Sequence, residues 1–423
     1  MPLHDASEGR LGAKRSVRAI AAYCRRRLAR LQAAQPAIEV RLATQHTILD
    51  EMRSAGPATT GFDYLRIGLA TAVLTWHSII VSTGSAPLDR ALWSGSFRFL
   101  PAAILPMFFA LSGFLVSASL ERTWLHQFLA LRVLRIVPAL AVVVVLSALV
   151  LGPFFTALPL LRYFTSPEFG LFFLNIAGLI HFTLPGVFEL NPDPRFIASQ
   201  LWTIPFEFEC YFALAILSLL NLLRDRRAFV QIIVLSALAA TVCALLFSPV
   251  SPFDHVPGTV LVLCFLAAVS LYLYRDAIPY SPRLAIASGM ASAVFLEIPN
   301  ASYLAAFPVA YLTVWLGLRN PPRIPFGDLS YGVYLLHFPI EQTIMHLVPG
   351  AGSWWRLTLL TLPPTFACAW LSWNLIEHPI LSRKAAILAA LDRAMEAAAA
   401  AIRPFVPRRV RQPDQSEAVR SRE

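Results

Sequence analysis

Residues 136–158 read IVPALAVVVVLSALVLGPFFTAL and contain no charged side chain. A helix rises about 1.5 Å per residue, and the hydrocarbon core of a bilayer takes about 20 apolar residues to cross. Further runs that are mostly apolar lie around residues 64–84, 201–223, 228–248 and 256–274. The pattern predicts a chain that folds in a membrane as a bundle of spanning helices.

The composition of the chain excludes an ordinary water-soluble enzyme. Of its 423 residues, 57% are hydrophobic and only 14% are charged, whereas soluble domains carry about 25% charged residues. A soluble core of this length could not bury so much apolar surface. The cysteines are scattered without metal-ligand spacing, so we expect neither a metal site nor a disulfide framework. They are Cys24, Cys210, Cys243, Cys264 and Cys368.

The charge pattern divides the chain into three parts. We expect a basic cytoplasmic leader over residues 1–60, a membrane domain over 61–380, and a cytoplasmic amphipathic helix with a polar tail over 381–423. The net charge of +10 is concentrated in the two outer parts. Nucleic-acid binding is one interpretation of basic ends. Basic flanks of membrane spans are more typical of the cytoplasmic face beside anionic lipid, so we expect lipid partners and no nucleic acid.

The number of spans depends on the short apolar piece at residues 169–184. If this piece crossed the membrane, the basic loop Arg224–Arg227 would lie outside the cell. If it is re-entrant, that loop lies inside with the other basic loops, as positive-inside counting favours. The sequence therefore predicts an all-α polytopic bundle of about ten transmembrane helices with cytoplasmic N and C termini. The expected spans lie near 64–84, 101–120, 136–158, 201–223, 228–248, 256–274, 281–297, 301–318, 328–348 and 357–376.

Ionisable side chains within a spanning helix are costly and mark candidate functional residues. Arg66 and His77 lie eleven residues apart, on nearly the same helix face and about 16 Å apart along the axis. A neutral imidazole near mid-membrane could take a proton from a hydroxyl or accept an acyl group. The alternative is a histidine satisfied by a neighbouring helix, with Arg66 extending its charge to the interface.

Arg132 and Arg135 share one face of a helix that enters the membrane. Paired guanidinium groups match the geometry of phosphate, as on coenzyme A. An ordinary basic flank is an equally good interpretation. Ser112 and Gly113, in the preceding span, are small residues typical of close helix packing.

Two further polar groups lie within later spans. Glu207 and Tyr211 share a helix face, and the carboxylate could orient a histidine, act as an acid or base, or pair with an arginine. Ser330, Tyr334 and His337 follow i, i+4, i+7 spacing. Such a stripe suits a substrate pocket, or hydrogen bonds between helices.

Six motifs follow one another in order along the chain. Together they resemble those of the acyltransferase 3 family of membrane enzymes, whose members O-acylate bacterial surface polysaccharides, O-antigens and exopolysaccharides. The resemblance covers about residues 62–380. It rests on R-x10-H at Arg66 and His77, F-x-L-S-G-F at 109–114, R-x-x-R-I-x-P at 132–138, W-T-I-P-F-E at 202–207, S-Y-x-x-Y-L-x-H at 330–337 and E-x-P at 377–379.

The resemblance implies a ten-span O-acyltransferase of the bacterial inner membrane. It would move an acyl group, acetyl by default, from acyl-coenzyme A to a hydroxyl of a glycan or lipid-linked sugar, without a tightly bound cofactor. A glycan or small-anion transporter without covalent chemistry remains the alternative. The resemblance assigns catalysis to His77, Glu207 and Arg66, donor contacts to Arg132, Arg135 and Ser112, and the acceptor or pocket lining to Trp202, Ser330, Tyr331, Tyr334 and His337.

Overall fold

The structure, a computed structural model, describes residues 46–402 except 57–58, 85–86 and 248–254. This part of the chain is helical, with three isolated β-bridges and no β-strand among the residues described. Most of the expected basic leader, and the polar tail beyond residue 402, lie outside the described residues.

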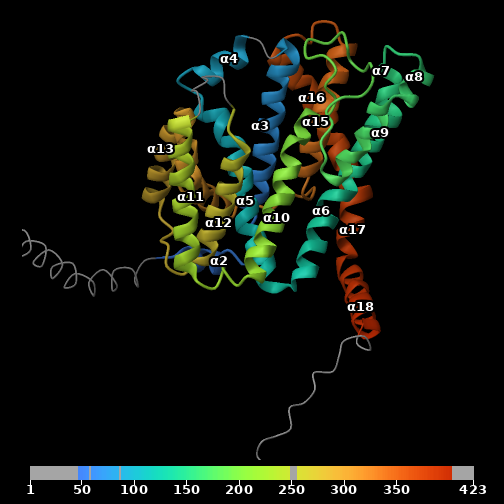
Figure 1. Ribbon diagram of the computed structural model, residues 1–423. Coiled ribbons are helices and arrows are strands. Elements are labelled where there is room, and N and C mark those ends of the chain that lie inside the picture. Colours follow the sequence, from blue (N-terminus) through green and yellow to red (C-terminus); the bar gives the residue numbers. More distant parts are fainter. Residues whose placement is uncertain (1–45, 57–58, 85–86, 248–254, 403–423) are drawn as a thin grey trace, which may run out of the picture.

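Ten helices occupy the ten segments that the sequence predicts as spans (Figure 1). Within the described residues, six helical segments are long and apolar enough to cross a membrane, and the chain is a multi-pass membrane protein. That all ten helices cross stays a prediction. The ten are α3 (Gly61–Thr83), α5 (Phe99–Arg122), α6 (Leu125–Leu146), α10 (Ile204–Leu219), α11 (Arg226–Phe247), α12 (Gly258–Leu273), α13 (Pro282–Glu297), α14 (Ala306–Gly317), α15 (Ser330–Leu347) and α16 (Trp354–Ser372).

The apolar piece expected at 169–184 is too short to cross the membrane as a helix. It forms α9 (Pro167–Phe172) and a 3-10 turn (Phe173–Ala177), and the chain continues without regular helix until Ser199. The α-helical residues rise about 1.5 Å each and the 3-10 residues about 2.0 Å each, so the two together extend about 19 Å, roughly two-thirds of the hydrocarbon thickness. Two more short helices, α7 (Gly152–Phe155) and α8 (Leu160–Thr165), precede it.

One end of the bundle carries a network of ion pairs, and we call it the basic end. The Arg135 guanidinium lies 2.6 Å from Asp328 and 2.8 Å from Glu377, and Arg66 lies 3.1 Å from Asp328. These residues join the starts of α3 and α15 to the middle of α6 and to the chain that follows α16. The network therefore aligns four helices at one end of the bundle.

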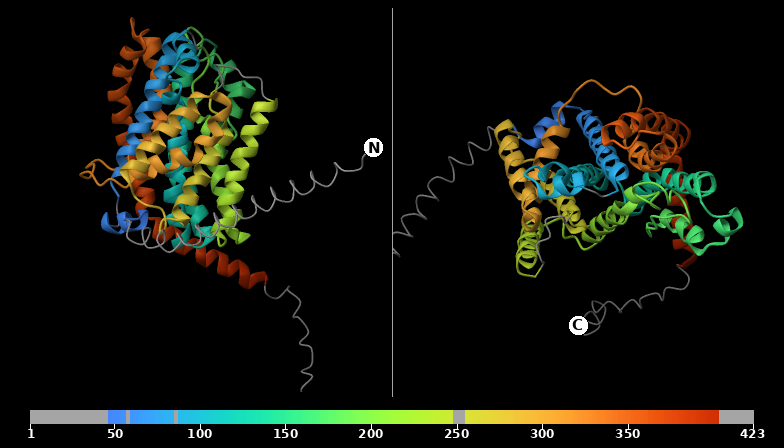
Figure 2. Two further views of the ribbon diagram at one scale, coloured as in Figure 1. Left: turned by 90° about the vertical axis from the view of Figure 1, so that its left-hand side faces the viewer. Right: turned by 90° about the horizontal axis from the view of Figure 1, so that it is seen from above.

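The first and last described helices both lie at the basic end (Figure 1). The Ile48 amide in α2 (Ile48–Ser54) donates to the Ile278 carbonyl, between α12 and α13, at 3.0 Å. In α18 (Lys384–Ile402), Asp392 accepts from His126 of α6 at 2.6 Å. Figure 2 shows α2 and α18 at this end from a second direction. The two described ends of the chain thus share one end of the bundle.

The long loop before α10 packs across part of the opposite end. The amide of Asn191 donates to the main-chain and side-chain oxygens of Gln342, and the Gln342 amide donates to the Asp193 carbonyl at 2.8 Å. The loop also packs on Gly84, which caps the end of α3, because a Cβ added at Gly84 would collide with the Pro192 carbonyl. The loop is therefore fastened to α15 and α3.

Gly113 provides the close helix contact that the sequence predicts. A Cβ at this position would collide with the Phe265 carbonyl, so α5 and α12 approach backbone to backbone. The buried core lies between these helices and α14, with α3, α15 and α16 packed alongside.

Candidate active site

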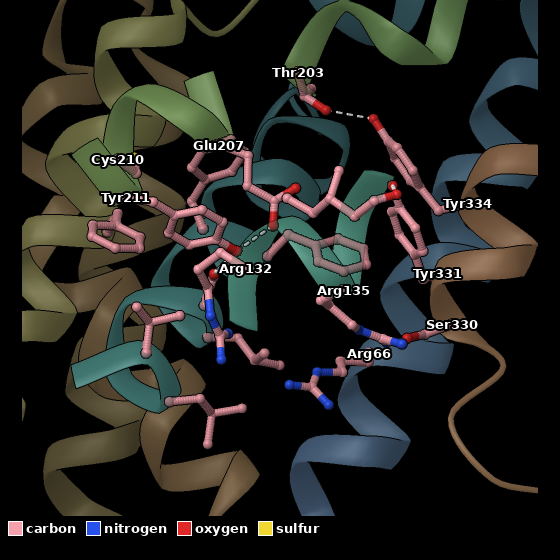
Figure 3. A pocket seen from close by; sticks show the side chains of 18 of the residues that line it. Arg66, Arg132, Arg135, Thr203, Glu207, Cys210, Tyr211, Ser330, Tyr331 and Tyr334 are labelled. Carbon is pink, nitrogen blue, oxygen red and sulfur yellow. Dashed lines mark hydrogen bonds between the residues drawn. The ribbon is translucent and has the colours of Figure 1, made fainter. Parts of the chain in front are cut away.

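A cavity of about 130 Å³ opens among the helices near the basic end, and we call it the arginine cavity. Figure 3 shows the three arginine side chains gathered at one end of it and the Thr203–Tyr334 hydrogen bond at the other. It brings together eight of the predicted site residues from α3, α5, α6, α10 and α15. They are Arg66, Ser112, Arg132, Arg135, Glu207, Ser330, Tyr331 and Tyr334.

The three arginines of this cavity have different partners. Arg66 and Arg135 are neutralised in the ion-pair network with Asp328 and Glu377. Arg132 makes no ion pair within the described part of the chain; its guanidinium carbon lies 5.9 Å from the ring centres of both Phe128 and Tyr211. Its Nε is buried and has no hydrogen-bond partner there. Arg132 is therefore the guanidinium most available to an anion.

Glu207 faces the cavity from the first turns of α10. The Tyr211 hydroxyl donates to its carboxylate, as the predicted i, i+4 spacing allows. The Ser112 hydroxyl lies 3.2 Å from the same Tyr211 oxygen and links α5 to α10. The carboxylate thus belongs to a polar chain within the arginine cavity.

His77 lies in a second cavity, of about 440 Å³, which we call the tryptophan cavity. It is bounded by α3, α4 (Pro87–Ser94), α5 and the loop before α10. Its volume falls within the range of small-molecule sites, about 300–1,000 Å³. Its aromatic and polar lining residues include Trp76, His77, Trp93, Asp193, Ser199, Trp202 and His255.

His77 pairs with His337 of α15 in a defined tautomer. His77 Nδ1 lies 2.7 Å from His337 Nε2, and the rings stack with centres 5.0 Å apart. His337 Nδ1 lies 3.1 Å from the Val333 carbonyl, which can only accept a hydrogen bond. His337 therefore carries its proton on Nδ1 and accepts from His77 Nδ1–H at Nε2. This leaves the His77 Nε2 lone pair unused by any described residue.

Tyr334 stands between the two cavities and lines both, as does Leu105. The Tyr334 hydroxyl lies 2.5 Å from the Gln200 carbonyl and 2.5 Å from the Thr203 hydroxyl. Since the carbonyl only accepts, the Tyr334 hydroxyl donates to the Gln200 carbonyl and accepts a hydrogen bond from the Thr203 hydroxyl. This arrangement separates the arginines from the histidine pair.

A comparison with known families identifies the chain. The sequence model of an acyltransferase domain matches residues 59–374, a region that contains both cavities. The chain belongs to the acyltransferase 3 family. The resemblance read from its motifs is thus confirmed.

Among its relatives, this family member is 30% identical to nodulation protein 10 of Rhizobium leguminosarum bv. viciae, over 78% of this chain and 95% of that protein. It is 24% identical to an O-acetyl transferase of Shigella phage Sf6, over 76% and 96% of the two chains. It is 27% identical to the peptidoglycan O-acetyltransferase OatA of Listeria monocytogenes, over 65% of this chain and 50% of that protein. No solved structure matches the chain.

The predicted site residues of this family member lie in two separate cavities, and the sequence does not predict this division. Trp202 and His77 line the tryptophan cavity, apart from Arg132 and Glu207. His337, expected to line a pocket, lies fully buried behind His77. Glu207, considered as a partner for a histidine, is bound by Tyr211 instead.

Several lining residues could not be singled out from the sequence. Trp76 and Asp193 belong to no sequence pattern that would mark them as site residues. His255 lies at the start of an apolar run, which likewise does not indicate a site. Thr203 is part of the W-T-I-P-F-E motif, which was the one available hint. Each becomes notable only through the cavity that it lines.

Proposed function

We propose that the protein is a membrane O-acyltransferase that moves an acyl group, acetyl in the simplest case, from acyl-coenzyme A to a hydroxyl of a carbohydrate. The observation that carries the proposal is the free His77 Nε2 in a cavity, held in its basic form by His337. The names of two relatives, an O-acetyl transferase and a peptidoglycan O-acetyltransferase, support both the reaction and a glycan acceptor.

The donor approaches from the basic end, which we assign to the cytoplasmic face of the bacterial inner membrane. Both described chain ends and the basic loops lie there, in keeping with positive-inside orientation and ten spans. Arg132 is suited to a phosphate of coenzyme A because it makes no salt bridge within the described structure. Ser112 and Glu207 line the path beyond it.

His77 acts as the general base in the direct route. Nε2 accepts the proton of the acceptor hydroxyl while the hydroxyl oxygen bonds to the thioester carbon. The carbon–sulfur bond breaks, and the leaving thiolate takes the proton from the imidazolium. The His337 hydrogen bond to Nδ1 fixes the ring and favours the charge that develops on it.

A two-step route uses the same nitrogen as nucleophile. The Nε2 lone pair bonds to the thioester carbon, the carbon–sulfur bond breaks, and coenzyme A leaves as the thiolate, which gives an acyl-imidazolium. The acceptor hydroxyl oxygen then bonds to the acyl carbon, the carbon–nitrogen bond breaks to restore the neutral imidazole, and the hydroxyl proton neutralises the thiolate. In both routes the thioester must pass between Tyr334 and Leu105 to reach His77, because those residues divide the cavities.

The test is transfer by purified protein in proteoliposomes, with radiolabelled acetyl-coenzyme A and polysaccharide from the envelope of the host bacterium. His77→Ala should abolish transfer and leave a monodisperse protein. Arg132→Ala should raise the KM for acetyl-coenzyme A by about tenfold with little change in kcat, because it removes uniform binding energy. A fully active His77→Ala protein would refute the proposal.

Transport without covalent chemistry was the alternative function. Membership of an acyltransferase family favours acyl transfer. The same proteoliposomes separate the two functions, since a transporter would move sugar across the bilayer without releasing coenzyme A.

A further inference from the structure

The tryptophan cavity contains a carboxylate that no described residue satisfies. Asp193 is 6% exposed, and no hydrogen bond reaches its carboxylate from the described part of the protein. Its main-chain carbonyl is held by Gln342, and the neighbouring Asn191 is also bonded to Gln342. The loop therefore holds this carboxylate in place at the cavity.

The Asp193 carboxylate oxygens are not among the fully buried atoms of the described residues, so the carboxylate faces the cavity as an acceptor that no described residue uses. Asp193 lies in a loop outside the spanning helices, and burial alone raises the pKa of its carboxyl to about 6. At neutral pH the group is thus still ionised, and it needs hydrogen-bond donors. A ligand that enters the cavity with hydrogen-bond donors therefore finds in Asp193 an acceptor without a competing protein partner.

The rest of the lining indicates what kind of ligand this is. The cavity is lined by Trp76, Trp93 and Trp202, and indole rings are large apolar surfaces of the kind that pack against the C–H groups of a sugar ring. No lysine or arginine is among the described residues that line it. A phosphate or other anion would find no counter-charge beside Asp193, whereas a neutral polyol offers hydroxyl donors and an apolar ring face.

We propose that the tryptophan cavity is the acceptor site, that it binds a sugar ring against its indoles, and that Asp193 accepts hydrogen bonds from the sugar hydroxyls. This inference rests on the proposed function. The sugar enters from the end opposite the arginines, since the loop that bears Asp193 packs on the ends of α3 and α15 distant from Arg66 and Asp328. Asp193 positions the acceptor while His77, in the same cavity, activates it.

The experiment compares Asp193→Asn with Glu189→Gln, which removes a charge from an exposed position of the same loop. The full-length proteins are assayed in proteoliposomes with labelled acetyl-coenzyme A. The acceptor probe is oligosaccharide released by mild acid from the host envelope polysaccharide, used either free or as the polyprenyl-linked fraction. The two forms distinguish a free glycan from a lipid-linked one.

Asp193→Asn should raise the KM for the oligosaccharide by about tenfold or more, the effect of losing a hydrogen bond to a charged group. The KM for acetyl-coenzyme A should stay unchanged, and Glu189→Gln should behave as wild type. Asp193→Glu, which keeps the carboxylate, should recover part of the affinity. Trp202→Leu should also raise the KM for the oligosaccharide.

Three results would overturn the inference. They are an unchanged oligosaccharide KM in Asp193→Asn, an effect confined to the KM for acetyl-coenzyme A, or an equal effect in Glu189→Gln. If wild-type protein releases no coenzyme A from acetyl-coenzyme A and acylates neither form of the sugar, the proposed function itself fails. If coenzyme A is released and the sugar is acylated with normal KM in the Asp193 variant, only the acceptor site is wrong.

Discussion

At the scale of single residues, the histidine pair shows how function depends on hydrogen-bond direction. His77 and His337 are 260 positions apart, yet their ring nitrogens lie 2.7 Å apart. The Val333 carbonyl determines where the His337 proton lies, and this in turn determines the tautomer of His77. One main-chain oxygen therefore decides which nitrogen of His77 is basic.

We expect His337→Ala to lower kcat by about 100-fold, a typical effect of disabling acid–base catalysis, while both KM values change little. His77 would then lack the partner that orients its ring and accepts its Nδ1 proton. His337→Gln should restore part of the rate, because the amide oxygen of glutamine can accept the hydrogen bond from His77 Nδ1–H. Steady-state transfer kinetics on the three proteins test this. A purely structural role would be indicated if both variants lost folded protein in proportion to activity.

The two arginines of α6 show that neighbouring residues of one type can differ in their ion-pair partners. Arg132 and Arg135 are equivalent in spacing, but Arg135 is bound by two carboxylates and Arg132 by none of the described residues. Sequence spacing predicts that they share a face. It does not predict that Asp328 and Glu377 arrive from distant helices to neutralise only one of them.

At the scale of elements, α15 joins the parts of the site. Ser330 and Tyr334 line the arginine cavity, His337 supports His77 one turn further on, and Gln342 holds the loop with Asp193. Side chains at i, i+4 and i+7 recur on one face of a helix. A single helix therefore connects the arginine cavity, the histidine pair and the loop before α10.

The contact of α5 with α12 gives a prediction about stability. Gly113→Ala should lower the stability of the bundle by about 1–3 kcal/mol, because its Cβ would collide with the Phe265 carbonyl and force the helices apart. The matched control is Gly68→Ala in α3, where no neighbour lies within 4 Å of the added carbon. Thermal unfolding followed by fluorescence-detected size exclusion measures both. Equal melting temperatures for the two variants would contradict the close contact.

At the scale of the whole molecule, two cavities lie on either side of Tyr334. One lies toward the basic end and carries the arginines; the other lies toward the opposite end and carries His77 and Asp193. Such an arrangement suits a donor and an acceptor that reside on different sides of a membrane. It also makes the orientation of the bundle a direct test of the mechanism.

We predict that the loop before α10 faces the periplasm and that α18 faces the cytoplasm. In a background without the native cysteines, Glu189→Cys should react with a membrane-impermeant maleimide in intact spheroplasts, because this residue is exposed at the end opposite the arginines. Glu396→Cys, exposed on α18, should react only after lysis. Labelling of both sites in intact cells would contradict ten spans with cytoplasmic ends.

The sequence by itself determined that the chain folds in a membrane, which segments form helices, and to which family the chain belongs. Apolar runs of about 20 residues can satisfy their backbone groups in lipid only as helices, so composition and length were sufficient. The motifs, from Arg66 to Pro379, then led to the acyltransferase 3 family, which the matching domain confirms.

Only the tertiary structure decided how the polar residues are grouped. Helix periodicity states which side chains share a face, but it says nothing about which face of a distant helix they meet. The pairing of His77 with His337, the free charge of Arg132, the division at Tyr334 and the presence of Asp193 beside three indoles all depend on contacts between segments far apart in the chain.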